Sequence, residues 1–382
     1  MLRFVTILLF IIAIAVRSAL LGGVAALLGL ALIVTGLWTT RVGRALKVQR
    51  TVSPVLALGD TAEVVITLTN GSVLPVPWLL LMESVPPLLR ALPLPHTVVA
   101  LAAGGTRIFR YPVRAAQRGW YQLGPLQVRL GDVLGLGQHN LTLPAANVTV
   151  LPRVLPLAAL PLPALLPFGP LSTSRRRGED PARPAGVRPY QGSDGVRRID
   201  WKATAHRNDL MVRRADPAIA PETTLALAFR AADYPARVLH DSLERAITAT
   251  ASLSVALLQR KLPVGLITNG IDPKHQDAVI ALAQAKGDGQ RLRLLETLGR
   301  LTLGSGGSLW EIMAQQPLPW GGTVVIVCAD LTPDALPDVL RLLRRGQQLV
   351  VCLVEPTTLG QATARRYGIG CLVVDERGNV GR

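Results

Sequence analysis

The chain has 382 residues, enough for two or three domains that each bury a core. Its hydrophobic content of 49% and mean hydropathy of +0.35 are high for a water-soluble protein, and its formal net charge is +16. This balance favours contact with an anionic partner, either nucleic acid or a cytoplasmic membrane face, although GC-rich coding sequence also produces an Arg-rich chain. The five His show no HxxxH or HExxH spacing, which argues against a zinc site.

The first forty residues contain two apolar runs. Residues 4–16 (FVTILLFIIAIAV) are followed by Arg17-Ser18 and then by residues 19–38 (ALLGGVAALLGLALIVTGLW). The second run has about the 20 residues that a membrane helix needs, whereas the first is shorter. We predict two transmembrane helices in a tight hairpin within residues 1–40. A signal peptide, or insertion of the second run alone, is the alternative.

Basic residues without an intervening acid follow the second run: Arg41, Arg44, Lys47 and Arg50. By the positive-inside rule, this end of the span faces the cytoplasm. We therefore expect a multi-pass protein of the cytoplasmic (inner) membrane whose main domains face the cytoplasm. The lipid bilayer is then one of its partners.

Residues 41–150 alternate apolar and polar positions in short runs, as strands do. The clearest predicted strands are Ala62–Thr69, Val76–Glu83, Thr106–Val113 and Leu126–Leu130. Their spacing, without helical periodicity, predicts a small β-sandwich-like domain. Residues 151–174 are apolar and rich in Pro, and we interpret them as a rigid connector.

Residues 217–382 alternate strand and helix patterns, which predicts an α/β domain with a doubly wound, mainly parallel sheet. The predicted strands are Thr223–Phe229, Pro263–Thr268, Thr323–Cys328, Gln348–Val354 and Cys371–Val374. The predicted helices are Val238–Lys261, Gln290–Leu301, Thr332–Arg345 and Thr358–Tyr367. All three Cys lie within apolar runs, without CxxC spacing, and are expected to be buried, reduced thiols.

Ligands of such a sheet bind beyond the carboxyl ends of its strands. Asp233, Asp272 and Asp330 lie in loops at those ends and could together hold a hard cation, although a strand-end Asp is more often a cap or turn residue. The sequence has no GxGxxG after a strand, no GxxxxGK[ST] and no GxSxG. We interpret the GSGG of 304–307 as a flexible connection. No catalytic residue and no cofactor is predicted.

Residues 175–216 are dense in Arg, interleaved with Asp and Glu, and they carry a motif. The motif runs from Arg188-Pro189-Tyr190 through Arg197-Arg198-Ile199-Asp200-Trp201-Lys202-Ala203-Thr204-Ala205 to Leu210-Met211-Val212-Arg213. It resembles the signature of the domain-of-unknown-function-58 (DUF58) family, R-x-Y-x-x-G-D-x-x-R-x-I-D-W-[RK]-A-[ST]-A-R followed by L-x-V-[RK]. The run RGWYQLGP…GDVLGL of 118–136 is similar to a second stretch of that family.

The resemblance implies two membrane helices, a β-sandwich-like segment, the signature and a von Willebrand factor A-like α/β domain. It also implies a membrane-anchored protein without enzymatic activity, found alongside MoxR-type AAA+ ATPases and linked to complex assembly or envelope processes.

The chain departs from the family at several positions. Ser193 stands for the family's Gly and His206 for its Arg. The Asp-x-Ser-x-Ser metal motif expected after the first A-domain strand is degenerate at Arg230, Ala232 and Asp233, so no metal is expected. The Arg230 guanidinium can take the place of the cation.

We interpret the signature as a paired network that seats it on the A-like domain, with Asp200 and Trp201 buried and paired with Arg. The network residues are Arg188, Tyr190, Asp194, Arg197, Arg198, Asp200, Trp201, Lys202 and Arg213. The basic run Arg175–Arg177 is left to meet lipid headgroups or a partner.

The leading hypothesis is a membrane-anchored interaction or assembly factor that docks a MoxR-like AAA+ ATPase or another membrane-complex protein. The alternative is an enzyme with an anion-binding active site around Asp194 and Asp200, where Arg residues clamp the anion. Nucleic-acid binding ranks last, and no nucleic-acid partner is expected, because the aromatic residues lie mostly within apolar runs.

Overall fold

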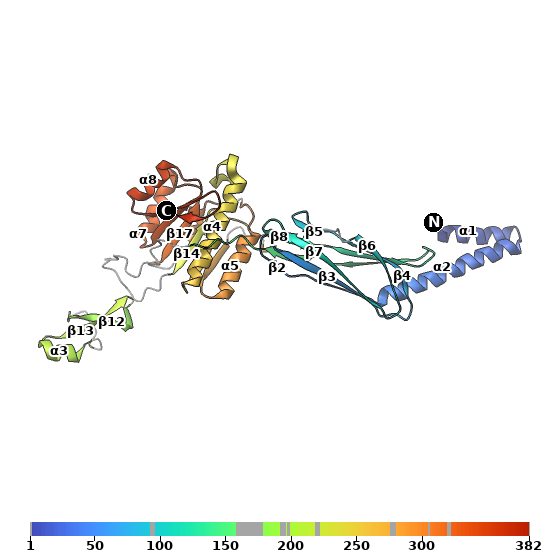
Figure 1. Cartoon of the computed structure of the whole chain (residues 1–382), viewed down its shortest axis with the longest axis horizontal. Coiled ribbons are helices and arrows are strands. Elements are labelled where there is room, and N and C mark those ends of the chain that lie inside the picture. Colours follow the sequence, from blue (N-terminus) through green and yellow to red (C-terminus); the bar gives the residue numbers. More distant parts are fainter. Residues whose placement is uncertain are drawn as a thin grey trace. The chain divides into compact units, whose positions relative to one another are not determined.

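The computed structural model describes residues 2–91, 96–157, 179–191, 196, 199–217, 222–275, 280–304, 306–318 and 322–381. The chain divides into two compact units. The β unit comprises Met1–Pro152 with Leu298–Arg300, and the α/β unit comprises Arg153–Thr297 with Leu301–Arg382. Figure 1 colours the first mainly blue to green and the second mainly yellow to red. Arg175–Arg177 and most of the Pro-rich connector lie outside the described residues.

Two helices open the β unit. They are α1 (Leu2–Ala15) and α2 (Ala19–Ala45), which lie side by side (Figure 1). The Ser18 hydroxyl caps α2 by accepting a hydrogen bond from the backbone N–H of Leu21 at 3.4 Å. Among the described residues, α2 is the one helix long and apolar enough to cross a membrane, and α1 is shorter. One of the two predicted spans is thus a helix with the required length and composition.

The strands of the β unit form three sheets. Their orders are β1 (Leu46–Thr51), β3 (Thr61–Asn70), β7 (Thr106–Ala115), β5 (Leu89–Ala91); β10 (Gln138–Leu143), β9 (Leu126–Gly131), β4 (Val76–Glu83), β6 (His96–Leu101); and β2 (Val55–Leu56), β11 (Ala146–Val150), β8 (Gly119–Leu123). The two four-stranded sheets are antiparallel. Alternate residues such as Val64 and Ile66 of β3 and Leu79 and Leu81 of β4 share one apolar core. The predicted β-rich region and its four clearest strands are confirmed.

A buried ion pair crosses the interior of the β unit. Arg50 and Glu83 are paired, with 7% and 0% of their side chains exposed. The Tyr111 hydroxyl donates to the same carboxylate, and Arg50 also donates to the carbonyls of Leu123, at 3.0 Å, and Pro144, at 2.6 Å. Burial, reinforced by Glu83, raises the pKa of Tyr111 above its usual value, so the hydroxyl remains a donor. The charges are therefore buried with their hydrogen-bonding needs met.

Removing one member of this network is expected to destabilise the β unit. Glu83→Ala strands a buried guanidinium, and we expect a loss of about 3–5 kcal/mol in the free energy of unfolding. Glu63→Ala is the matched control, because the Glu63–Arg110 pair is exposed and 4.0 Å long, and we expect less than about 1 kcal/mol there. Urea unfolding in mild detergent, followed by Trp fluorescence, measures both. Equal losses would contradict the assignment.

The α/β unit is built on a seven-stranded sheet. Its order is β16 (Ile280–Ala285), β15 (Val264–Thr268), β14 (Thr223–Leu227), β17 (Thr323–Cys328), β18 (Gln348–Leu353), β19 (Gly370–Val374), β20 (Val380–Gly381). The five inner strands are parallel, and the two edge strands are antiparallel to their neighbours. The prediction of a mixed α/β unit with a mainly parallel sheet is confirmed. The edge strands β16 and β20 were not predicted.

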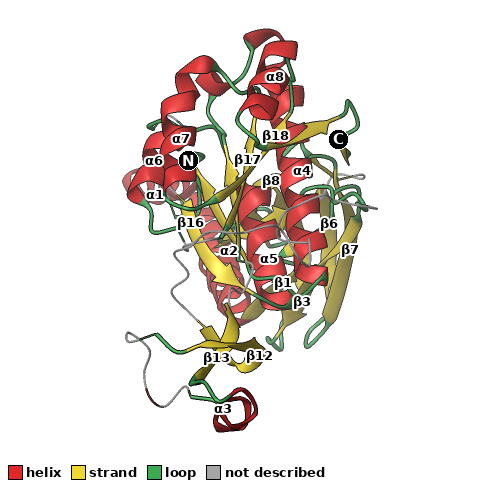
Figure 2. Cartoon of the chain, turned by 90° about the vertical axis from the view of Figure 1, so that its left-hand side faces the viewer, coloured by secondary structure: helices red, strands yellow, loops and turns green. Residues whose placement is uncertain are grey.

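Helices pack on this sheet, as Figure 2 shows in red against yellow strands. They are α4 (Leu239–Gln259), α5 (Asp288–Arg300), α6 (Leu309–Gln315), α7 (Leu336–Arg344) and α8 (Thr358–Arg366). Residues of α6, α7 and α8 share a core with Ala226 and Ile326 of the sheet. The predicted helices are present, whereas α6 was not predicted. Cys328 and Cys352 are buried and Cys371 is half-buried, and all three are free thiols.

Candidate functional site

Strand β14 lies at the switch point of the sheet. The chain continues from β14 to β15 on one side, and later returns to β17 on the other. In open sheets of this kind, side chains that follow the carboxyl ends of the strands at the switch point form the ligand site. Here those side chains come from the segment after β14 and from Asn269, which follows β15.

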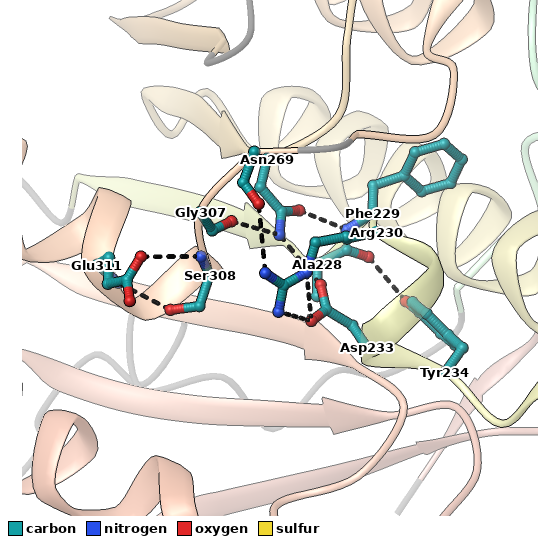
Figure 3. Close-up of polar contacts among 10 residues, drawn as sticks. Ala228, Phe229, Arg230, Asp233, Tyr234, Asn269, Gly307, Ser308 and Glu311 are labelled. Atoms are coloured by element: carbon teal, nitrogen blue, oxygen red, sulfur yellow. Dashed lines mark hydrogen bonds and ion pairs between the residues drawn. The ribbon is translucent and has the colours of Figure 1, made fainter.

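Three hydrogen-bonded polar residues, Arg230, Asp233 and Asn269, lie at this position, and we call them the Arg230 cluster (Figure 3). The Arg230 guanidinium donates to Asp233 Oδ1 from Nη2 at 2.8 Å and from Nε at 3.2 Å. The Asn269 amide donates to Asp233 Oδ2 at 3.0 Å, while its Oδ1 accepts the backbone N–H of Phe229 at 2.6 Å. Asn269 is fully buried, whereas the Arg230 and Asp233 side chains are 27% and 17% exposed. The carboxylate is thus neutralised by a residue of its own chain.

The glycine-rich loop that precedes α6 completes the cluster. Gly304 donates its N–H to the Phe229 carbonyl at 3.0 Å, and a Cβ at Gly304 would lie 1.8 Å from the Asn269 carbonyl oxygen. Arg230 Nη1 donates to the Gly306 carbonyl at 3.3 Å. Ser308 then starts α6 with a capping box to Glu311. The loop was expected to be only a flexible connection, but its described residues pack against the site because no side chain intervenes.

The other strand-end carboxylates have separate partners. Asp272, which is 3% exposed, accepts the backbone N–H of Lys274 at 3.0 Å. Asp330 accepts the Thr357 hydroxyl at 2.5 Å, beside the first turn of α8. No group of three or more His, Cys, Asp or Glu able to hold a metal occurs among the described residues. The structure therefore does not bring Asp233, Asp272 and Asp330 together as a cation site.

Two titratable groups beside the cluster are held neutral. Burial, followed by the charges of Asp330 and Asp233, raises the pKa of the Cys328 thiol to about 12. Burial also raises the pKa of Tyr234, whose hydroxyl donates to the Ala228 carbonyl at 2.9 Å. Neither group is ionised at neutral pH, so Cys328 lacks the thiolate that nucleophilic chemistry requires.

Asn269 is expected to contribute most of the stability of the Arg230 cluster. Asn269→Ala leaves the Phe229 N–H buried without its acceptor, and we expect a loss of about 1–3 kcal/mol in the free energy of unfolding. Asn379→Ala is the matched control, because its amide also donates to an Asp, Asp375, at 2.8 Å, but in an exposed turn. That change should cost less than about 0.5 kcal/mol. Urea unfolding measures both, and equal costs would refute the role of Asn269.

The signature forms a small folded element of its own, which we call the signature module. It comprises the described residues between 179 and 217, with the elements β12 (Glu179–Pro189), α3 (Trp201–Arg207) and β13 (Met211–Pro217). The two strands pair antiparallel, with Arg188 opposite Val212. Ile199, Met211 and Val212 are buried within it. The Thr204 hydroxyl accepts the Met211 N–H at 3.0 Å and so ties α3 to β13.

Asp200 is the N-cap of α3. Its Oδ1 accepts the backbone N–H groups of Lys202 and Ala203, each at 3.1 Å, and its own N–H donates to the Met211 carbonyl at 2.8 Å. The helix ends at Asn208, whose left-handed backbone (φ 55°) suits an Asn C-terminal cap. The chemistry shown for this carboxylate is helix capping.

Trp201 differs from the sequence expectation. We expected it to be buried with Asp200, but its exposed fraction is 65%. The reason is local: the N-cap fixes Trp201 as the first residue of α3, and all seven residues of this short helix lack full burial. Three other apolar residues of the module are exposed: Val187, Val196 and Leu210.

The remaining signature residues are placed in part. Arg188, on β12, donates to the Pro189 carbonyl at 3.2 Å. Tyr190 donates its backbone N–H to the Leu210 carbonyl at 2.8 Å, and Lys202 is exposed on α3. Arg213 lies on β13 opposite Val187. Asp194, Arg197 and Arg198 lie outside the described residues, so the proposed Asp–Arg pairing among them stays a prediction.

The capping role of Asp200 can be separated from a role of its charge. Asp200→Ala removes the acceptor, and we expect α3 amide exchange to accelerate about fivefold, since a lost N-cap costs about 1 kcal/mol. Asp200→Asn keeps an acceptor of similar capping strength and should leave the rate unchanged. Hydrogen exchange read by mass spectrometry on the α3 peptide tests this. Equal acceleration in the two variants would show that the charge, and not the cap, is required.

The described residues thus define a two-unit protein: a β-rich unit with an apolar N-terminal helix able to cross a membrane, and a mixed α/β unit. Residues 186–358 match the model of the family described as "Protein of unknown function DUF58". The match begins within the signature module and extends through β18 to the start of α8. It therefore contains both the Arg230 cluster and the signature motif, whereas the second similar run, residues 118–136, lies outside it.

Comparisons with solved structures give only partial likenesses. The chain is similar to an α-2-macroglobulin fragment from Escherichia coli (19% identity, 31% of this chain and 20% of that chain, TM-score 0.23). It is also similar to the cupredoxin domain of amoB from Nitrosocaldus yellowstonii (15% identity, 28% of this chain and 87% of that chain, TM-score 0.21). A third similar structure is the CARDB domain of PF1109 from Pyrococcus furiosus (14% identity, 28% of this chain and 86% of that chain, TM-score 0.20). The chain thus spans about a fifth of the macroglobulin fragment. No curated protein matches the chain.

Sequence reasoning did not identify three residues that hold the site together: Asn269, Ser308 and Glu311. Asn269 was overlooked because Asn-Gly after a strand is typical of a turn, and nothing in its neighbourhood signals a buried amide. Ser308 and Glu311 were overlooked although Ser-x-x-Glu before apolar residues is a readable helix start. That signal would have identified α6.

Proposed function

We propose that this protein is a membrane-anchored interaction or assembly factor that works by binding a partner, a MoxR-like AAA+ ATPase, rather than by catalysis. The observation that carries the proposal is the exposed Trp201 on the capped helix α3. It lies within the stretch that matches the DUF58 family model. A large aromatic side chain left in water on an ordered element favours a docking role.

The signature module supplies what a docking element needs. Asp200 and Thr204 fix α3 to β13, so Trp201 is presented without a large ordering cost on binding. The exposed Val187, Val196 and Leu210 add apolar surface on the same module. The Asp200 carboxylate accepts from the backbone of α3, which favours a structural over an acid-base role.

The Arg230 cluster supports partner binding without a metal ion. In the proposed von Willebrand factor A-like fold, this edge of the sheet would carry a metal. Here the Arg230 guanidinium pairs with Asp233 and supplies the positive charge from the chain itself. A partner that meets this edge would contact a fixed cation that chelators cannot remove.

The membrane anchor is proposed to be the α1–α2 hairpin, in the cytoplasmic membrane, with both units facing the cytoplasm. The basic flank at the end of α2 supports this orientation through Arg41, Arg44 and Lys47, which are exposed. Arg50 belongs to the same flank in sequence, but its side chain is buried against Glu83. It therefore stabilises the β unit and does not face lipid.

A binding measurement tests the partner proposal. The full-length protein in mild detergent is titrated with a purified MoxR-like AAA+ ATPase. Trp201→Ala should raise the dissociation constant by about 30-fold or more, because truncating a Trp anchor costs about 2 kcal/mol or more of binding free energy.

Leu359→Ala provides the matched control. Leu359 is 62% exposed on α8, so its truncation also removes exposed apolar surface, and binding should change by less than about twofold. Binding by the parent protein that is insensitive to Trp201→Ala would refute the docking site. Absence of any binding by the parent protein would refute the choice of partner.

A further inference from the structure

Helix α2 enters the β unit without a linker. Val42 and Leu46 belong to the apolar core of the strands, and Trp38 packs against it. A Cβ at Gly43 would lie 2.2 Å from the His139 ring, so the helix backbone touches β10 directly. Figure 1 shows α2 meeting the strands at the end of the β unit away from β2 and β8. We call this the helix end.

Three loops emerge at the helix end. In the strand register, Leu46, which follows α2, lies opposite Asn70, and Thr69 lies opposite Thr106. Val76 pairs with Leu101, and Trp78 with Gly131. The loops 71–75, 102–105 and 132–137 therefore leave their sheets on the side where α2 arrives.

The tips of these loops are apolar and exposed. Val73, Val133 and Leu134 have exposed fractions of 86%, 81% and 65%. The only charged residue in the three loops is Asp132, which is 5% exposed. Its carboxylate is turned inward and accepts the backbone N–H groups of Leu134, at 2.6 Å, Leu136, at 3.3 Å, and Gly137.

Indole and amide donors hold the loops in place. The Trp38 indole donates to the Pro75 carbonyl at 3.1 Å, and the Trp78 indole donates to the Asp132 carbonyl at 2.9 Å. The Asn70 amide joins two loops by donating to the carbonyls of Leu74 and Ala102, each at 2.9 Å. The exposed apolar tips are therefore carried by ordered loops.

The 132–137 loop reaches the apolar part of α2. At 1.5 Å per residue, the 20 residues 19–38 span about 30 Å, the thickness of a hydrocarbon core, which puts Trp38 at the boundary. A Cβ at Gly137 would lie 2.8 Å from Thr39 Oγ1 and 2.9 Å from the Thr35 carbonyl oxygen. The loop is thus level with the last turn of the apolar segment.

We propose that the helix end of the β unit is a second membrane contact, in which Val73, Val133 and Leu134 insert into the bilayer interface. This inference rests on the proposed anchoring of the chain by α2. A lipid partner fits because the loops adjoin the membrane helix, and because the exposed basic residues Arg41, Arg44, Lys47 and Arg107 face headgroups from the same end. The β unit then has one fixed orientation on the membrane.

Depth-dependent fluorescence quenching tests the proposal on the full chain. Cys371→Ser removes the half-buried thiol, and Cys328 and Cys352 are buried. Val133→Cys is labelled with an environment-sensitive dye, and the protein is reconstituted in phosphatidylcholine–phosphatidylglycerol vesicles that contain lipid with a nitroxide on the upper acyl chain. The label at 133 should lose most of its fluorescence to the lipid quencher and resist aqueous iodide.

Two further label sites separate the possible outcomes. Leu88→Cys, 46% exposed in a loop at the opposite end, should be quenched by iodide and not by lipid. Leu27→Cys, 69% exposed near the middle of the apolar run 19–38, reports on anchoring alone when the nitroxide is on the lower acyl chain. Lipid quenching at 27 but not at 133 would overturn this inference and leave the anchor intact. Loss of lipid quenching at 27 would overturn the anchor, and this inference with it.

Discussion

The constraint on which the β unit depends is that α2 ends inside its core. Val42 and Leu46 are buried together with the strands, and Gly43 permits the backbone to touch His139. A helix and a sheet that share one core cannot reorient separately without exposing apolar surface. Whatever fixes the apolar part of α2 therefore also fixes the sheets. Gly43 and Gly137 cannot be replaced by larger residues without a shift, because a Cβ at either position would clash with a neighbouring residue.

A second theme is that several Arg side chains are used within the chain. Three Arg side chains form ion pairs with acidic residues: Arg50 with Glu83, Arg230 with Asp233, and Arg245 with Glu355. Each of these guanidiniums also donates a hydrogen bond to a backbone carbonyl. These guanidiniums contribute to the formal charge of +16, but each is already paired with a carboxylate of the chain. Net charge alone is therefore a poor guide to what this protein binds, and the exposed bases near α2 are more informative.

The fold was largely predictable because its strands and helices carry clear periodicity. Strands β3, β4 and β9 alternate buried and more exposed residues, and β14, β15, β17 and β18 are mainly apolar, as buried parallel strands require. The antiparallel pair of β12 and β13 was not predicted, because both strands are rich in Pro and Arg. The site was less predictable, since the partners Asn269 and Asp233 are 36 residues apart and meet only when β14 and β15 pair.

The tryptophans show why sequence alone misplaced the signature. Trp38 and Trp78 both donate their indole N–H to loop carbonyls at the helix end, where their rings pack in the β unit. Trp201 differs from them, because the Asp200 cap makes it the first residue of a short helix without a buried residue. Burial of a Trp depends on whether its element has a core to join. A two-stranded module with a seven-residue helix has too little core to cover an indole, so its Trp stays exposed.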